Sequence, residues 1–271
     1  LLANKQYSVL LKTEADQDTL EPKLQDLLDD NIKFKKEICP STEPLEIKTD
    51  TVLRKDFIHI LNCRVFVKEG ATLKIEPGTT ILADEDTSLV IERGAKIDAQ
   101  GTKDQAITFT SSSDELLSSP GGKWDGIHIF GRAPIQGDFF TREAADTLQE
   151  IIGYGTGGGD KPEDNSGVLK FVKVLHAGTT LPALEFVGVG SKTTIENIEI
   201  RHSNDDGLVF KGGTADFKYV SILESVKDNL QMDSGYNGRG QFIFIDLITS
   251  TASESAIKIL GEDDLRVTNP R

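Results

Sequence analysis

Apolar residues recur at matching positions in four segments of the second half of the chain. The segments follow one another at offsets of 26, 22 and 25 residues and begin at Val168, Thr194, Asp216 and Gln241. Their aliphatic residues form two columns: Val172, Ile198, Val220 and Ile245, then Val174, Ile200, Ile222 and Leu247. A second strand follows each first one, marked at offsets of 24, 22 and 27 residues by Leu184, Leu208, Leu230 and Ile257. Repeats of this length without a helical pattern between them predict a solenoid of stacked strands.

The first half of the chain fits the same architecture. Between residues 57 and 110, short runs rich in aliphatic residues alternate with turn signals, namely Glu69-Gly70, Pro77-Gly78, Arg93-Gly94 and Gln100-Gly101. Strands of three to five residues at this spacing are too short for a sandwich and suit the faces of a parallel β-helix.

Residues 1–45 have a different pattern. Leu20, Leu24, Leu27 and Leu28 recur at helical spacing. An uncovered first coil would expose strand edges, so we expect this helix to form an N-terminal cap. The expected organisation is therefore a helical cap over 1–45 and a β-helix domain over 46–271.

Residues 111–166 interrupt the coils. We expect a strand over 124–130, a helix over 141–152, and a glycine-rich, acidic loop over 153–165. Loops on rigid scaffolds often carry binding function, although a long insertion can also be a decorated turn. We therefore place the candidate binding residues in or beside an insertion over 131–166, at Trp124, Tyr154, Asp160 and Asp164. Burial of Trp124 is the alternative to sugar stacking.

The composition excludes some partners. The chain has 271 residues and a net charge of −14, whereas nucleic-acid binding needs a basic face. No apolar run is long enough to span a membrane. The acidic balance suits metal cations, or solubility alone.

Two cysteines, Cys39 and Cys63, suit a single disulfide, with two unrelated buried thiols as the alternative. A disulfide would place the protein outside the cytoplasm. The chain begins at Leu1 and its only methionine is Met232. We therefore expect that a signal peptide has been removed.

Six segments in order carry a family resemblance: residues 70–81 (GATLKIEPGTTI), 88–97 (SLVIERGAKI), 101–111 (GTKDQAITFTS), 124–131 (WDGIHIFG), 164–172 (DNSGVLKFV) and 205–213 (DDGLVFKGG). From about residue 50 to 260 the chain resembles bacterial surface or secreted proteins, often lipoproteins, with a right-handed parallel β-helix of pectate-lyase-like architecture. The resemblance implies this fold and an extracellular or outer-surface location. It does not imply a reaction, because most such proteins have no established activity.

Aspartates gather beside the second strands. Alignment places Asp206 over Asp228, about 4.8 Å apart in stacked coils, with Asp205 and Asp233 nearby. Such carboxylates could share calcium, which prefers oxygen ligands. The alternative is an outward turn in which Lys227 neutralises one of them.

A second column contains His176, His202 and Glu224. Two imidazoles and a carboxylate in neighbouring coils could hold zinc or another transition metal. Hydrogen-bonded corner histidines are the alternative.

No catalytic residue can be assigned. A lyase would need a base such as Arg201, Lys211 or Arg239 beside bound calcium, yet the pectate-lyase signatures are absent. A hydrolase would need two carboxylates in a cleft. A column of Phe171, Tyr219 and Phe244, interrupted by Asn197, is expected to pack beside the core, and Lys173 should pair with Glu199.

We therefore predict an extracellular, non-catalytic scaffold or adhesin that binds a glycan or protein partner, with calcium as a possible stabilising cofactor. A polysaccharide lyase or glycoside hydrolase is one alternative. Another is a subunit of a surface filament, formed by end-to-end self-association through open strand edges.

Overall fold

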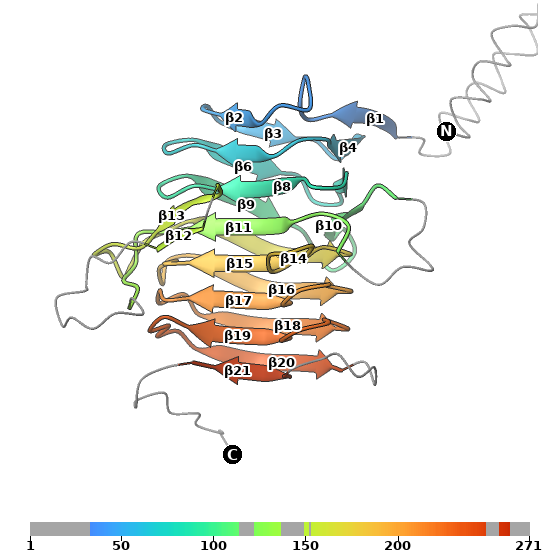
Figure 1. The fold of residues 1–271 in the computed structure, drawn as a ribbon. Helices are drawn as coiled ribbons and strands as arrows, with labels where there is room; N and C mark the ends of the chain where they lie inside the picture. Colours follow the sequence, from blue (N-terminus) through green and yellow to red (C-terminus); the bar gives the residue numbers. More distant parts are fainter. Residues whose placement is uncertain (1–32, 114–121, 137–148, 152, 248–254, 261–271) are drawn as a thin grey trace, which may run out of the picture. The chain divides into compact units, whose positions relative to one another are not determined.

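The computed structural model describes residues 33–113, 122–136, 149–151, 153–247 and 255–260. Their regular elements are all strands, and nearly all the strands pair in parallel. Figure 1 shows the strands stacked coil upon coil from the blue β2 to the red β21. The predicted all-β parallel solenoid is confirmed.

Sheet B receives one strand from each of eight coils. Its members are β2 (Leu45–Ile47), β5 (Val65–Val67), β8 (Ser88–Ile91), β11 (Gly126–Phe130), β15 (Leu184–Val187), β17 (Leu208–Lys211), β19 (Leu230–Asp233) and β21 (Ile257–Ile259). Alternate residues of each strand point into the solenoid, so Leu184, Leu208 and Leu230 stack in register and are fully buried.

Sheet A forms the rest of the coil wall. Its principal strands are β1 (Phe34–Glu37), β4 (Phe57–Leu61), β7 (Thr80–Ala83), β10 (Ile107–Ser111), β14 (Gly167–Leu175), β16 (Thr194–Arg201), β18 (Phe217–Leu223) and β20 (Gly240–Asp246). The early coils add separate short strands, β3 (Thr51–Leu53), β6 (Thr72–Ile75) and β9 (Lys96–Gln100). β14 pairs with β9 through its first half and with β10 through its second half. From β14 onward, one long strand therefore replaces two short ones.

A single left-handed residue bends each long strand. The backbone φ is 50° at Phe171, 55° at Asn197, 57° at Tyr219 and 57° at Phe242. Left-handed backbone costs about 1–2 kcal/mol for a residue with a Cβ atom. The bend also interrupts the inward–outward alternation, which lets Leu169 and Val172, two positions of unequal parity, both enter the core.

Aliphatic columns and stacked rings fill the interior. Phe186 stacks on Phe210 at 5.0 Å between ring centroids, and Phe210 stacks on Phe217 at 4.8 Å. Trp124 lies over Phe109 in the same core. Full burial of each such side chain contributes roughly 1.5–3 kcal/mol, so the coils are held together mainly by these columns.

The register expected for the fourth segment is wrong by two residues. Val220 pairs with Ile243, and Ile222 pairs with Ile245. A slip of two positions leaves every side chain on the same face of a strand, so the apolar pattern alone cannot detect it. The correction places Phe242, rather than Phe244, in the column of Phe171 and Tyr219.

The insertion forms a small antiparallel hairpin of β12 (Gln149–Ile151) and β13 (Gly155–Gly157). The helix expected over 141–152 is therefore wrong at Gln149–Ile151, and its remaining positions lie outside the described residues. Parts of the insertion pack on the outer face of sheet B around Tyr154 and Phe130. They give that face a second small core.

The expected helix of the N-terminal cap also lies outside the described residues. The compact unit that holds the coils begins at Lys35. The reason is that β1 pairs with β4 and β2 pairs with β5, which makes this segment part of the first coil.

Cys39 and Cys63 form the predicted disulfide, with 6.1 Å between their Cα atoms. Both side chains are buried, and the bond joins the chain just after β1 to the chain just after β4. The double substitution Cys39→Ser/Cys63→Ser should lower the free energy of unfolding by roughly 3 kcal/mol, because it frees the closed loop in the unfolded chain. Urea denaturation measures the change. A wild-type midpoint unaffected by reductant would contradict the expectation.

Candidate functional site

The left-handed bends of sheet A carry side chains to the outside of the solenoid. Phe171, Asn197, Tyr219 and Phe242 form a column in four successive coils, which we call the ring column. Tyr219 is 48% exposed and Phe242 is 65% exposed. Their rings stack with 4.8 Å between centroids and 5° between planes. The expectation that these aromatics pack beside the core is therefore wrong, since the bend turns them toward solvent.

The ring column borders a groove of 440 Å³, which we call the ring groove. A polar column of Lys173, Glu199 and Ser221 forms its second side. Lys173 lies 3.0 Å from Glu199, which confirms the predicted cross-strand pair. Lys103 and Ala106, from the turn between β9 and β10, also line it. The groove thus combines exposed ring surface with hydrogen-bonding groups.

Asn197 is the one non-aromatic member of the ring column. Its carboxamide forms no hydrogen bond to any other residue that the structure describes. The amide can donate two hydrogen bonds and accept two. An unengaged polar group between aromatic neighbours marks this position as chemically different from the rest of the column.

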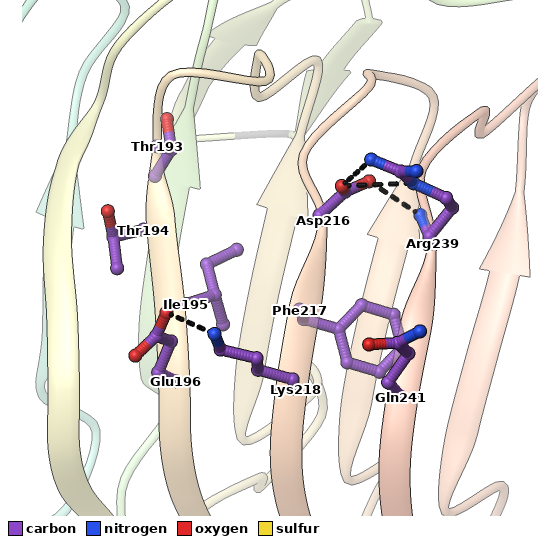
Figure 2. Close-up of a pocket in the computed structure, with 9 residues that line it drawn as sticks. All are labelled: Thr193, Thr194, Ile195, Glu196, Asp216, Phe217, Lys218, Arg239 and Gln241. Atoms are coloured by element: carbon purple, nitrogen blue, oxygen red, sulfur yellow. Dashed lines mark hydrogen bonds and ion pairs between the residues drawn. The ribbon is translucent and has the colours of Figure 1, made fainter.

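A polar pocket of 320 Å³ lies beside the parts of β16, β18 and β20 that precede their left-handed residues (Figure 2). Its charged side chains pair with each other: Arg239 Nη2 lies 2.6 Å from Asp216, and Lys218 Nζ lies 3.0 Å from Glu196. The hydrogen bond from Lys218 holds the pKa of Glu196 below its usual value. Lys218 Nζ also lies 5.8 Å from the centroid of the Tyr219 ring. The charged side chains of this pocket therefore largely satisfy one another.

The aspartates expected to bind calcium occupy neighbouring coils. Asp206 accepts a hydrogen bond from the backbone amide of Asp228 at 2.9 Å, and Lys258 Nζ lies 2.8 Å from Asp228. Lys227 Nζ lies 2.5 Å from Asp205, and Asp233 accepts a hydrogen bond from Gln231. Among the described residues no three histidine, cysteine or acidic side chains cluster as a metal site would require. Calcium binding by Asp205, Asp206, Asp228 and Asp233 stays a prediction.

Burial raises the pKa of Asp206 to about 6, and the charges of Asp205 and Asp228 add to this rise. The folded pKa lies above the ordinary 3.8. Protonation therefore stabilises the fold fully at low pH, and this contribution is lost as the pH rises through 6.

Asp206→Asn should accordingly raise the free energy of unfolding by roughly 1–2 kcal/mol at pH 8, with little effect near pH 4. Thermal melts in chelator at both pH values measure it, with the exposed Asp104→Asn as a control. A loss of stability at pH 8 in calcium, absent in chelator, would instead identify Asp206 as a calcium ligand.

His176, His202 and Glu224 also lie in one column, each in left-handed backbone. The two imidazoles stack at 4.8 Å, and His202 Nδ1 lies 2.5 Å from Glu224. Burial and the neighbouring His202 lower the pKa of His176. His202 therefore matches a hydrogen-bonded corner histidine, with His176 stacked on it, and transition-metal binding here stays a prediction.

Two of the four expected binding residues are buried. Trp124 has no exposed surface, and its indole donates a hydrogen bond to the carbonyl of Leu175 at 3.0 Å. Tyr154 is buried and donates a hydrogen bond to Asp125. Neither ring offers a free face to a ligand, because the insertion and the core cover them. Asp160 is exposed, and Asp164 lines an open pocket of 590 Å³ with Arg132 and Lys161.

A buried polar network lies beneath Tyr154 of the insertion, and only its Lys211 was named from the sequence, as a possible lyase base. His128 and Glu185 are fully buried on neighbouring strands of sheet B, with His128 Nδ1 3.1 Å from Glu185. Lys211 Nζ lies 3.0 Å from the same carboxylate. Burial tends to raise the pKa of Glu185, but the bond from His128 and the charge of Lys211 lower it overall. The sequence carries a signal for this network, because each of the three otherwise apolar strands β11, β15 and β17 contains one titratable residue.

The described part of the chain contains no helix with the length and apolar character that crossing a bilayer requires. No curated protein and no solved structure matches the chain. Residues 45–266 match the family described as the pectate-lyase-like β-helix domain. This match covers most of the chain and nearly all of the coils seen in the structure, and the chain therefore belongs to the pectate-lyase-like β-helix family.

Proposed function

We propose that the protein is an extracellular, non-catalytic β-helix that binds a glycan along the ring groove. One observation carries the proposal: Tyr219 and Phe242 are exposed large aromatic side chains that stack in order beside a polar column. Exposed aromatic surface of this kind marks interaction sites, since ordinary folding tends to bury it.

The chemistry of the groove suits a carbohydrate. A pyranose ring presents C–H groups on its faces and hydroxyl groups at its edge. The faces can pack on aromatic rings, while Lys173, Glu199 and Ser221 can exchange hydrogen bonds with the hydroxyls. A purely apolar partner would remove water from the Lys173–Glu199 ion pair and from the Ser221 hydroxyl without offering them a hydrogen bond, which is costly.

The disulfide supports the extracellular location, because such bonds persist in oxidising compartments. Membership of the pectate-lyase-like β-helix family is consistent with it. The rigid coils would hold the ring groove in a fixed shape, which reduces the entropy lost on binding.

A polysaccharide-cleaving enzyme is the second candidate, and the pKa of about 6 at Asp206 favours it, since general acids have raised pKa values. Against it, Asp205 and Asp228 are each engaged by a lysine, and none of these aspartates lines the grooves described above. Release of reducing ends from a bound glycan would support cleavage.

Glycan-array binding tests the proposal. Wild-type protein should bind at least one glycan, and Tyr219→Ala/Phe242→Ala should weaken that binding at least ~10-fold, which corresponds to about 1.4 kcal/mol. Phe34→Ala removes a phenylalanine that is 57% exposed, a value between those of Tyr219 and Phe242, from β1, outside the ring groove, and should bind like wild type. Equal losses in both variants, or no binding by wild type, would refute the proposal.

A further inference from the structure

The ring column contains a gap whose size follows from the coil spacing. Neighbouring coils of a β-helix lie about 4.8 Å apart, and the Tyr219 and Phe242 centroids are 4.8 Å apart. Phe171 and Tyr219 are separated by two coils, because Asn197 occupies the coil between them. Their positions are therefore about 9.6 Å apart along the column.

We infer that this gap is a subsite that holds one pyranose ring between Phe171 and Tyr219, with Asn197 beneath it. This inference rests on the proposed glycan-binding function and assigns it a single recognition unit. A ring placed midway is about 4.8 Å from each aromatic neighbour, a separation that the puckered, C–H-bearing faces of a saturated sugar can fill.

The floor of the gap favours a hydroxylated ligand. The Asn197 carboxamide is unengaged by other described residues and lines the ring groove. It can therefore donate to one ring hydroxyl and accept from the next. A flat apolar ring could occupy the same space, but it would leave the donor and the acceptor of the amide unpaired.

The rim adds polar contacts on two sides. Lys173 and Glu199 border the gap from the polar column, and Lys103 stands beside Phe171 in the same groove. Lys103 forms no ion pair with any residue in the described part of the chain, so its ammonium is available to a ligand. Lys218, held by Glu196, is near the ring of Tyr219. The gap therefore has aromatic ends, Phe171 and Tyr219, and polar sides, and we call it the slot.

Substitution at Asn197 tests the slot directly. Asn197→Phe should fill it and complete the ring column. The fold should accept this change, because Phe171 and Phe242 already adopt the same left-handed backbone. Asn197→Ala keeps the slot but removes the amide. Melting temperatures close to that of wild type establish that both variants are folded.

The probes are methyl glycosides of glucose, galactose, mannose and N-acetylglucosamine, with p-nitrophenol as the flat aromatic probe, titrated by NMR. We expect one methyl glycoside to bind wild type, with at least ~10-fold weaker binding in Asn197→Phe and a smaller loss in Asn197→Ala. Binding of p-nitrophenol in preference to every glycoside would overturn the ligand class. No glycoside binding by wild type would overturn the subsite.

Binding of the glycan found on the array distinguishes a failure of this inference from a failure of the proposed function. If Asn197→Phe binds that glycan like wild type while Tyr219→Ala/Phe242→Ala does not, the exposed rings act as an open platform and the slot is wrong. If wild type binds no glycan, both fail.

Discussion

Gly167→Ala is expected to cost at least ~4 kcal/mol of folding free energy, the range that marks a disrupted backbone contact. Gly167 begins β14 at a φ of 114°, which L side chains rarely adopt. A Cβ atom there would lie 1.9 Å from the carbonyl oxygen of Ile97, far inside van der Waals contact. Ile97 is a fully buried member of β9, so neither strand can move without opening the core. Urea denaturation followed by circular dichroism measures the loss.

Gly70→Ala is the matched control. Gly70 also has a positive φ, 86°, but a Cβ atom there would meet nothing within 4 Å. It should therefore cost only the backbone strain, about 1–2 kcal/mol. If the two variants lost equal stability, the tight contact between β14 and β9 would not be the cause.

Lys211→Met should cost roughly 3–5 kcal/mol at neutral pH, because it leaves the fully buried Glu185 carboxylate without its lysine partner. His128 alone would then face that charge. The effect should be largest where Glu185 is ionised. Chemical denaturation at pH 7 and pH 4 measures it.

The contribution of Glu185 to the free energy of unfolding changes with pH in a definite direction. The pKa of Glu185 is lowered in the fold, so its ionised form stabilises the protein above the ordinary value of 4.5 and the contribution fades as pH falls below it. Lys211→Met should flatten this acid-side loss. The double variant Lys211→Met/Glu185→Leu should recover much of the stability, since it removes the buried charge as well. A double variant as unstable as the single one would argue against an unpaired carboxylate.

The solenoid could be predicted because stacked coils repeat their apolar columns. The offsets of 26 and 22 residues place Val172, Ile198 and Val220 in one column, as the structure has them. The same reasoning misplaced β20, because a strand's side chains alternate with a period of two and Ile243 and Ile245 satisfy the pattern equally. Turn length, not hydrophobicity, decides between them.

The ring groove could not be predicted, for a related reason. Tyr219 points outward because its own backbone is left-handed. A left-handed conformation at a non-glycine residue has no clear sequence signal. The available clue was an aromatic residue directly before an inward aliphatic one, repeated at Phe171, Tyr219 and Phe242. For Trp124 the sequence left sugar stacking and burial open, and the structure has it buried.

The disulfide also affects which of the described coils unfold first. Each coil is held mainly by its neighbours, so a stack opens most readily at its ends. The first coil is tied covalently to the second through Cys39 and Cys63. The side chains of β20 and β21 are largely exposed, and no second disulfide joins the described coils. Among the described coils, local unfolding should therefore affect β20 and the ring groove before the coils joined by Cys39 and Cys63.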